Sequence, residues 1–133
     1  IFYRRLATLP TEPSEWLTHI QTSFYDELSE QDDIWLRWHT WFTRYLQRVE
    51  ENSFDDKERA NRMNSVNPCF VLRNYLSQQA IEKAETGDFS MIEALQTALQ
   101  TPYEESKIPA EFRNKRPDWA LNKAGCSMLS CSS

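Results

Sequence analysis

Residues 64–81 read NSVNPCFVLRNYLSQQAI and hold the clearest helix signals of the chain. Asn67 is a favourable N-cap, and Pro68 suits the first helical position, where the missing N–H costs no hydrogen bond. These signals predict a half-buried helix that begins at Pro68 and ends at Gly87. Its apolar face, at helical spacing, would be formed by Leu72, Leu76 and Ala80.

The same stretch, written Asn-Pro-x-x-Val-Leu-Arg-Asn-Tyr-Leu and followed by Gln-Gln-Ala-Ile, closely resembles a motif in the C-terminal region of the selenoprotein O family. The end of the chain resembles that family too, with RPDW at 116–119 and SCSS at 130–133, where the family has cysteine or selenocysteine third from last. The chain departs from the family pattern at Cys69, where a basic residue is expected, and at Cys126, an additional cysteine in a longer final segment.

The resemblance implies a parent protein with a kinase-like fold that moves AMP from ATP, with Mg²⁺, to hydroxyl side chains of other proteins. This chain would be only its last part, since Ile1 enters without a helix cap. Its partners would be the kinase-like N-terminal domain and the parent's protein substrates. The location would be cytoplasmic in a bacterium and mitochondrial in a eukaryote. Of the motif residues Asn67, Pro68, Arg73 and Asn74, we expect the last two to hold the central helix by polar contacts rather than bind substrate.

Composition favours helices, because the 133 residues are 40% hydrophobic and include only two glycines. The formal charge of −5 comes from interspersed acids and bases, which disfavours a nucleic-acid partner. No stretch approaches the roughly 18 apolar residues of a membrane span. Three cysteines without a secretory segment suggest a reducing compartment, in which any disulfide would be regulatory.

Helical spacing predicts four further helices besides the central one. The fold class is therefore all-α, an irregular bundle of four to five helices over residues 1–101, with an extended tail over 102–133 that Phe112 and Trp119 anchor. The last helix would lie antiparallel to the central one. The other helices would run from Pro13 to Ser29–Gln31, from Asp32 or Asp33 through Val49, from Ser53 through Arg62 and from Asp88 or Ser90 to Pro102. The core would include Ile20, Phe24, Trp38, Phe42, Leu72, Leu76 and Leu95.

Several residues admit both a functional and a structural interpretation. Trp35, Trp38 and Trp41 could stack on bases or sugars, but a core or domain-interface face is favoured because no basic groove accompanies them. A lone histidine, His19 or His39, is more often a satisfied polar group than a metal ligand. Asp55 and Asp56 could likewise bind metal, yet acids collect in the first turn of helices.

The chain lacks the motifs of a nucleotide site, because Gly87 and Gly125 are its only glycines and no phosphate-binding Gly loop can be written. We therefore expect no catalytic, cofactor or metal residue in this chain, with the ATP and Mg²⁺ sites of the parent upstream. Two interpretations remain: a non-catalytic C-terminal domain of an adenylyltransferase, or a stand-alone helical interaction module. A Gly-rich loop and kinase-like signature before Ile1 would distinguish them.

Cys131 is the residue expected to have chemistry of its own, as a regulatory thiol on a terminal tail. We expect a reversible disulfide with a cysteine of the kinase-like domain. Cys126 is a rival partner, separated from Cys131 by four residues, and Cys69 a weaker one because its helix should partly bury it. An inert thiol in a reducing cytosol remains the alternative.

Overall fold

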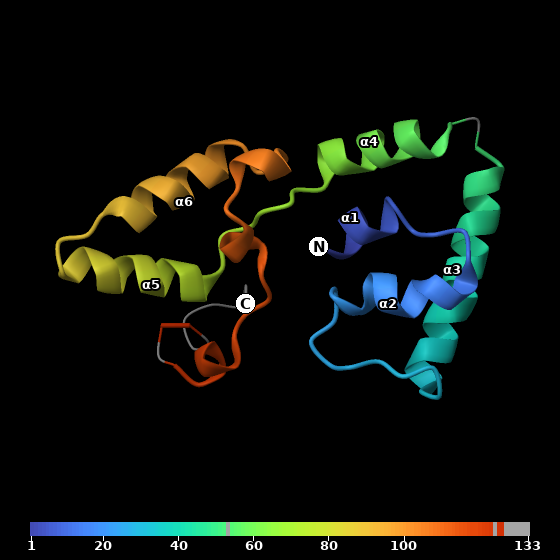
Figure 1. Ribbon diagram of the computed structural model, residues 1–133, viewed down its shortest axis with the longest axis horizontal. Helices are drawn as coiled ribbons and strands as arrows, with labels where there is room; N and C mark the ends of the chain where they lie inside the picture. Colours follow the sequence, from blue (N-terminus) through green and yellow to red (C-terminus); the bar gives the residue numbers. More distant parts are fainter. Residues whose placement is uncertain (53, 124, 127–133) are drawn as a thin grey trace. The chain divides into compact units, whose positions relative to one another are not determined.

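The computed structural model describes residues 1–52, 54–123 and 125–126 of the chain. Within these residues it has six α-helices, four short 3-10 helices and no strand, which confirms the all-α prediction (Figure 1). No helix of the described part is long and apolar enough to cross a membrane. The chain divides into two compact units, Ile1–Asn67 and Pro68–Ser133, and each is described by itself.

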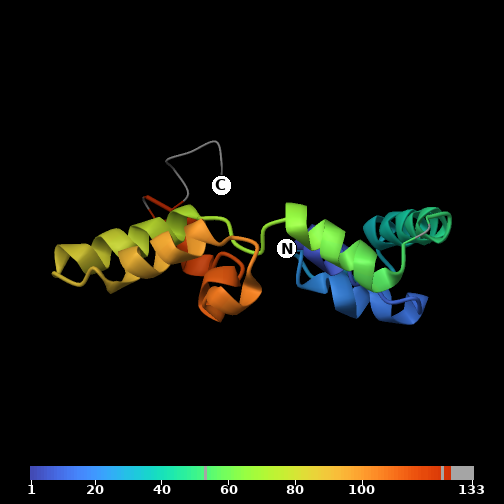
Figure 2. The same cartoon turned by 90° about the horizontal axis from the view of Figure 1, so that it is seen from above.

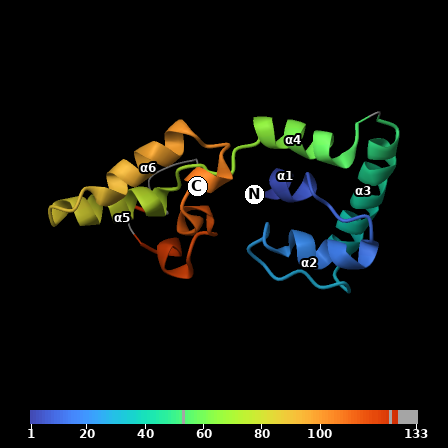
Figure 3. The ribbon, with the colours of Figure 1, turned by 45° about the horizontal axis from the view of Figure 1, so that its top comes forward.

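The first unit packs short helices beside one long one. Figures 1 and 3 show α1 between α2 and α4, and α1 contacts both neighbours. Its elements are α1 (Phe2–Leu6), η1 (Pro13–Glu15), α2 (Trp16–Gln21), α3 (Asp33–Glu50) and α4 (Asp56–Val66).

Helix α3 begins at the predicted residue and carries the aromatic side of the first core. Its Phe42 is fully buried, 5.7 Å from the ring of Trp16 and stacked on Trp38 at 5.6 Å. Trp41 is 42% exposed and stacks on Tyr45 at 5.5 Å, so it lies at the edge of this core. Such ring pairs add stabilisation beyond the apolar area that they bury. The buried residues are Leu6, Leu9, Trp16, Ile20, Trp35 and Phe42, with Phe24 and Trp38 partly buried against them.

The helix predicted from Pro13 to about Ser29 is shorter than expected, because it is a 3-10 turn followed by α2, which ends at Gln21. The Gln21 side chain organises the loop that follows. Its amide nitrogen donates to the Asp26 carbonyl at 2.9 Å, and its amide oxygen accepts from the Leu28 N–H at 3.0 Å. These bonds satisfy loop backbone groups that a longer helix would otherwise have paired.

Helix α1 was not predicted, since five residues are too few to show a periodic pattern. Tertiary contacts hold it in place. The Arg4 guanidinium donates to the carbonyls of Asn64 and Asn67 at 3.3 and 3.1 Å, at the end of α4. A cation there interacts favourably with the carbonyl end of the helix.

Helix α4 is capped by Asp55, whose carboxylate accepts from the Glu58 N–H at 2.7 Å. The predicted cap, Ser53, lies outside the described residues. The helix also continues beyond the predicted Arg62 to Val66. The acids of its first turn therefore have the structural role favoured above.

The second unit contains two helices and a folded C-terminal segment. Helices α5 and α6 lie side by side and antiparallel, as predicted (Figures 1 and 2). The turn between them closes a Schellman motif: Gly87 has a φ of +87°, and the N–H groups of Gly87 and Asp88 bond the carbonyls of Ala84 and Lys83. The elements are α5 (Asn74–Glu85), α6 (Ser90–Gln100), η2 (Glu105–Lys107), η3 (Ala110–Arg113) and η4 (Asp118–Leu121).

The predicted start of the central helix at Asn67 and Pro68 is wrong. Asn67 is the C-cap of α4, its side chain donates to the Met63 carbonyl at 2.7 Å, and α5 begins only at Asn74. Proline disfavours a helical conformation at the residue before it, which explains an extended Asn67. The segment that follows stays extended because the N–H groups of Cys69 and Phe70 both donate to the Pro102 carbonyl, at 2.8 and 3.3 Å. Leu72, expected in the core, is 39% exposed there.

Four described residues of the C-terminal segment, between 108 and 126, belong to the second core. Phe112, an expected anchor, is buried, and its ring lies 6.0 Å from that of Phe70. Trp119, the other expected anchor, is 46% exposed. The core residues are Cys69, Phe70, Tyr75, Leu76, Ala80, Leu95, Ala98, Ile108, Phe112, Ala120 and Cys126.

Candidate functional site

The two stretches that carry the family resemblance meet in the second unit. The Arg73 guanidinium donates to the Asn114 carbonyl at 2.8 Å, and the Tyr75 hydroxyl donates to the same carbonyl at 3.4 Å. The Tyr75 ring lies edge-on to Trp119, with 6.2 Å between centroids. We call Arg73, Tyr75, Asn114 and Trp119 the motif junction. It joins the start of α5 to a segment some 40 positions later in the chain.

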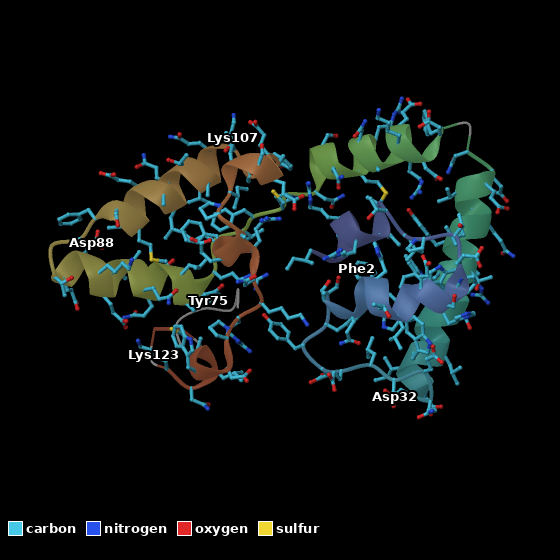
Figure 4. All side chains as sticks on the ribbon, viewed as in Figure 1. Phe2, Asp32, Tyr75, Asp88, Lys107 and Lys123 are labelled. Atoms are coloured by element: carbon cyan, nitrogen blue, oxygen red, sulfur yellow. The ribbon has the colours of Figure 1, made fainter. Side chains whose placement is uncertain are left out.

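A pocket of about 610 Å³ opens beside the motif junction, between α5, α6 and the segment from η3 to η4. Apolar side chains and the Trp119 indole make up much of its wall, and charged groups come from α5 and the C-terminal segment. Tyr75, which lines the pocket at the start of α5, is labelled in Figure 4. The lining residues are Tyr75, Leu76, Gln79, Lys83, Ser90, Met91, Ala94, Glu111, Phe112, Asn114, Lys115, Pro117 and Trp119.

The charges near the pocket are engaged in local contacts. Lys83 lies 3.9 Å from the Asp88 carboxylate, and hydrogen bonds from Ser90 lower the pKa of Asp88, with a smaller contribution from the Lys83 charge. On the other side of α5, a hydrogen bond from Lys123 lowers the pKa of Glu82, and one from Gln78 adds to that effect. Both shifts favour the ionised carboxylate, because each donor bonds its charged form.

The pocket does not fit a magnesium nucleotide. Its lining offers one carboxylate, Glu111, whereas Mg²⁺ in phosphate sites takes carboxylate and phosphate oxygens together. In the part of the chain that the structure describes, no group of three or more His, Cys, Asp or Glu residues could hold a metal ion.

Each of the two histidines contacts a group of the first unit. A ring nitrogen of His19 lies 2.8 Å from the Arg5 carbonyl, and the His39 ring packs 4.8 Å from that of Trp16.

The cysteines that the sequence singled out differ in their surroundings. Cys126 is 1% exposed, and Cys69 is also buried, with its thiol donating to the Pro102 carbonyl at 3.1 Å. Both are free thiols. Cys131 lies outside the described residues, so its pairing remains a prediction. Burial of a thiol in apolar surroundings makes it unreactive.

Comparisons with known proteins identify the family of the chain. The model of the family described as "Protein adenylyltransferase SelO" matches residues 2–100. The chain belongs to the SelO family. The match runs through both units and includes the Arg73 and Tyr75 side of the motif junction.

Relatives of the SelO chain extend the likeness to its C-terminal segment. Proteins named "Protein nucleotidyltransferase YdiU" are 42% identical over 135 residues in Flavobacterium johnsoniae, 44% over 137 in Tolumonas auensis and 46% over 132 in Methylobacillus flagellatus. These alignments cover 99–100% of this chain but only 25–26% of each relative. The chain therefore spans about a quarter of the length of the curated relatives that it matches.

The sequence identified Arg73 but not its partner Asn114, nor Lys123 and Gly125, which contact Glu82 and Gln78 of α5. Asn114 acts through its backbone carbonyl, which no side-chain pattern reveals. Gly125 carried a usable signal, because an isolated glycine in a non-periodic segment indicates a positive φ or a close backbone approach. The structure has both at this residue.

Proposed function

We propose that this chain is the non-catalytic helical C-terminal part of a protein adenylyltransferase, whose upstream kinase-like domain binds ATP and Mg²⁺ and transfers AMP to protein hydroxyl groups. The observation that supports this proposal is the motif junction. The family-like residues Arg73, Tyr75 and Trp119 bond or pack against the chain's own backbone and rings. They thus stabilise a fold rather than present a reactive centre.

The kinase-like domain is the proposed partner of the first unit, and the cytoplasm its proposed location in a bacterium. Ile34 and Trp41, seven residues apart on α3, are 58% and 42% exposed. Residues at this spacing lie on one side of a helix. Exposed apolar surface of this kind marks interaction sites, so we expect the isolated chain to self-associate or bind a hydrophobic dye. Sedimentation as a monomer without dye binding would contradict this.

A transfer assay tests the division of labour between the two parts. Full-length protein and the 133-residue chain are each incubated with ATP labelled at the α-phosphate, Mg²⁺ and a protein acceptor. The proposal expects label on the acceptor only with the full-length protein. Transfer by the 133-residue chain alone would refute the non-catalytic assignment, and no transfer by either would refute the adenylyltransferase assignment.

The C-terminal tail is proposed to be redox-sensitive through Cys131. Its thiol and a thiol of the kinase-like domain would each lose a proton and an electron to a peroxide, which is reduced to water as the disulfide forms. The bond would tether the tail and restrain or release transfer activity. A free thiol with a pKa of about 8.5 is mostly protonated at neutral pH, so docking of the tail must supply the reactivity.

Peptide mapping of the full-length protein after mild peroxide treatment tests the tether. A disulfide that contains Cys131, together with activity that responds to reductant in the wild type but not in Cys131→Ser, would support it. If Cys131 stays free and neither reductant nor Cys131→Ser changes activity, the redox role is wrong.

A further inference from the structure

The pocket of the second unit runs along helix α5, and we call it the α5 groove. Tyr75, Gln79 and Lys83 line it at a spacing of four residues, which places them on one face of α5. Met91 and Ala94 of the neighbouring α6 line it as well. The distance along α5 from Tyr75 to Lys83 is about 12 Å. An extended peptide of about four residues has the same length.

The apolar part of the α5 groove is accessible to solvent. Met91 and Ala94 are half-buried and pack against the edge of the second core. The Trp119 ring is 46% exposed, and the buried Tyr75 ring supports it from the side. Indole and thioether groups make favourable contacts with large apolar side chains. The volume of about 610 Å³ is in the range of ligand pockets, so the groove has room for such a side chain.

Basic residues are concentrated in the segment that forms another wall of the α5 groove. Residues 107–123 carry five basic and two acidic side chains, in a chain that has 15 basic and 20 acidic ones. The lining itself includes two lysines, Lys83 and Lys115, and one acid, Glu111. Lys115 follows Asn114, whose carbonyl Tyr75 bonds at the start of α5, whereas Lys83 lies in the last turn of that helix. Positive charge is therefore present at both ends of the groove.

Local contacts compensate little of this positive charge. The Lys83 side chain is 53% exposed, and its distance of 3.9 Å from the Asp88 carboxylate is long for an ion pair. Exposed pairs of this kind contribute little binding energy. Beside the groove, the Arg73 guanidinium bonds the Asn114 carbonyl, which is a neutral group. The α5 groove therefore favours a negatively charged occupant.

We propose that the α5 groove binds a short acidic segment of another protein, independently of the transfer activity proposed above. One large apolar side chain of the segment lies against Met91 and Trp119. Carboxylates on either side of it lie near Lys83 at one end of the groove and near Lys115 at the other. A polypeptide fits better than a nucleic acid, because a nucleic acid carries a phosphate at every position and Glu111 in the wall repels it.

Fluorescence polarisation of a labelled peptide with the full-length protein tests this proposal. The probe has one central phenylalanine with glutamates on both sides. A control probe with alanine in place of phenylalanine should bind about tenfold more weakly, as expected when a buried phenylalanine is lost. A second control with lysines in place of the glutamates should show no measurable binding. Added salt should weaken binding of the first probe, because it screens exposed charges.

Substitutions in the α5 groove should change the affinity for the probe in opposite directions. Lys83→Gln and Lys115→Gln should each weaken binding about two- to fivefold, as expected for an exposed charge pair. Glu111→Gln should strengthen binding by a similar factor, which misfolding of the variant could not do. Lys107→Gln is the matched control, since Lys107 belongs to the same basic segment but lies on η2, outside the lining of the groove (Figure 4). It should leave the affinity unchanged.

Several outcomes would overturn the proposal. Equal losses in Lys107→Gln and Lys83→Gln, or unchanged affinity in Glu111→Gln, would show that the probe responds to overall charge rather than to the α5 groove. A short single-stranded oligonucleotide that binds as tightly as the probe would show that the groove selects negative charge alone. If the probe binds the 133-residue chain but not the full-length protein, the rest of the polypeptide covers the groove, and docking of a separate protein is wrong.

Discussion

The two units bury their apolar side chains by different means. In the first, large side chains such as Trp16, Trp35 and Phe42 come from helices and meet as a cluster of rings. In the second, the helices contribute the small Ala80 and Ala98 beside larger residues such as Leu76, and the C-terminal segment supplies Phe112 and several neighbours. The core of the first unit is formed by the faces of helices, and the core of the second unit is completed by the C-terminal segment, whose sequence has no helical period.

This difference determines where each unit is vulnerable. Removal of a ring from the first core leaves a large cavity among rigid neighbours, and such cavities are costly because interiors relax only partly. In the second core, small helix residues allow close approach of the C-terminal segment. Loss of the segment's contacts should therefore loosen α5 and α6 as well. The predictions below test this contrast, from the largest expected effect to the smallest.

Phe42→Ala should lower the free energy of unfolding of the 133-residue chain by about 3–5 kcal/mol, the usual range for a buried phenylalanine. Phe42 is fully buried and contacts four tryptophan rings. Urea unfolding followed by tryptophan fluorescence measures the change. The control is Leu36→Ala on the same helix, which removes a 56% exposed side chain and should cost under about 1 kcal/mol. Similar losses in both variants would contradict the assignment of the first core.

Phe112→Ala should lower stability by about 3 kcal/mol, because this residue of the C-terminal segment is buried against Phe70. Hydrogen exchange should show lost protection in α5 and α6 while α3 keeps its own, since α3 belongs to the other unit. Phe89→Ala, which removes a 57% exposed ring, is the matched control and should have little effect. If Phe112→Ala has an equally small effect, Phe112 does not contribute to the core, and the segment behaves as the surface tail that the sequence suggested.

Asp55→Ala should cost about 1 kcal/mol, as the loss of a helix N-cap usually does. The Asp55 carboxylate accepts from the Glu58 N–H, whereas the N-cap residues of α3, α5 and α6 form no such side-chain bond. Asp55→Asn keeps an acceptor and should retain most of the stability. Thermal unfolding by circular dichroism at neutral pH compares the two variants. If both variants lose the same amount of stability, Asp55 does not stabilise the helix through the capping hydrogen bond.

The contrast between the units also explains what could be predicted from the sequence. Helix α3 and the α5–α6 turn were predicted almost to the residue, because Phe42 and its neighbours follow a 3.6-residue period and Gly87 closes a Schellman motif. The start at Pro68 was wrong, since the local signals at Asn67 compete with backbone bonds from Cys69 and Phe70 to Pro102, far along the chain. No local pattern contains such a contact.

In the candidate site, too, the sequence identified some residues but not the contacts between them. The motif residues Arg73 and Tyr75 were found by resemblance, and their partner Trp119 belongs to the second matching stretch. The sequence could not place these stretches together, because the contacts use a backbone carbonyl of Asn114 and the edge of a ring. The contacts of Lys123 with Glu82 and of Gly125 with Gln78 were missed for a related reason, because they join the C-terminal segment to residues of α5 far back in the chain.

The smallest predicted effect is a pH dependence at the turn between α5 and α6. Asp88 follows Gly87, and hydrogen bonds from Ser90 lower its pKa below the ordinary value of 3.8, with the nearby Lys83 charge acting in the same direction. A carboxyl whose pKa is lower in the folded state than in the unfolded state binds fewer protons when folded. Its contribution to stability is therefore fully present above about pH 4 and is lost as the pH falls through the folded pKa.

Asp88→Asn isolates this contribution because it keeps a hydrogen-bond acceptor but removes the titrating charge. The wild type should be slightly more stable than Asp88→Asn at pH 6, and the difference should shrink steadily as the pH falls below 4. Urea unfolding at a series of pH values measures the difference, and carbon NMR of the Asp88 carboxyl gives its pKa directly. The Ser90 N–H that donates to Asp88 at 3.0 Å begins α6, so a constant difference at every pH would show that this carboxylate is no better stabilised in the folded turn than in the unfolded chain.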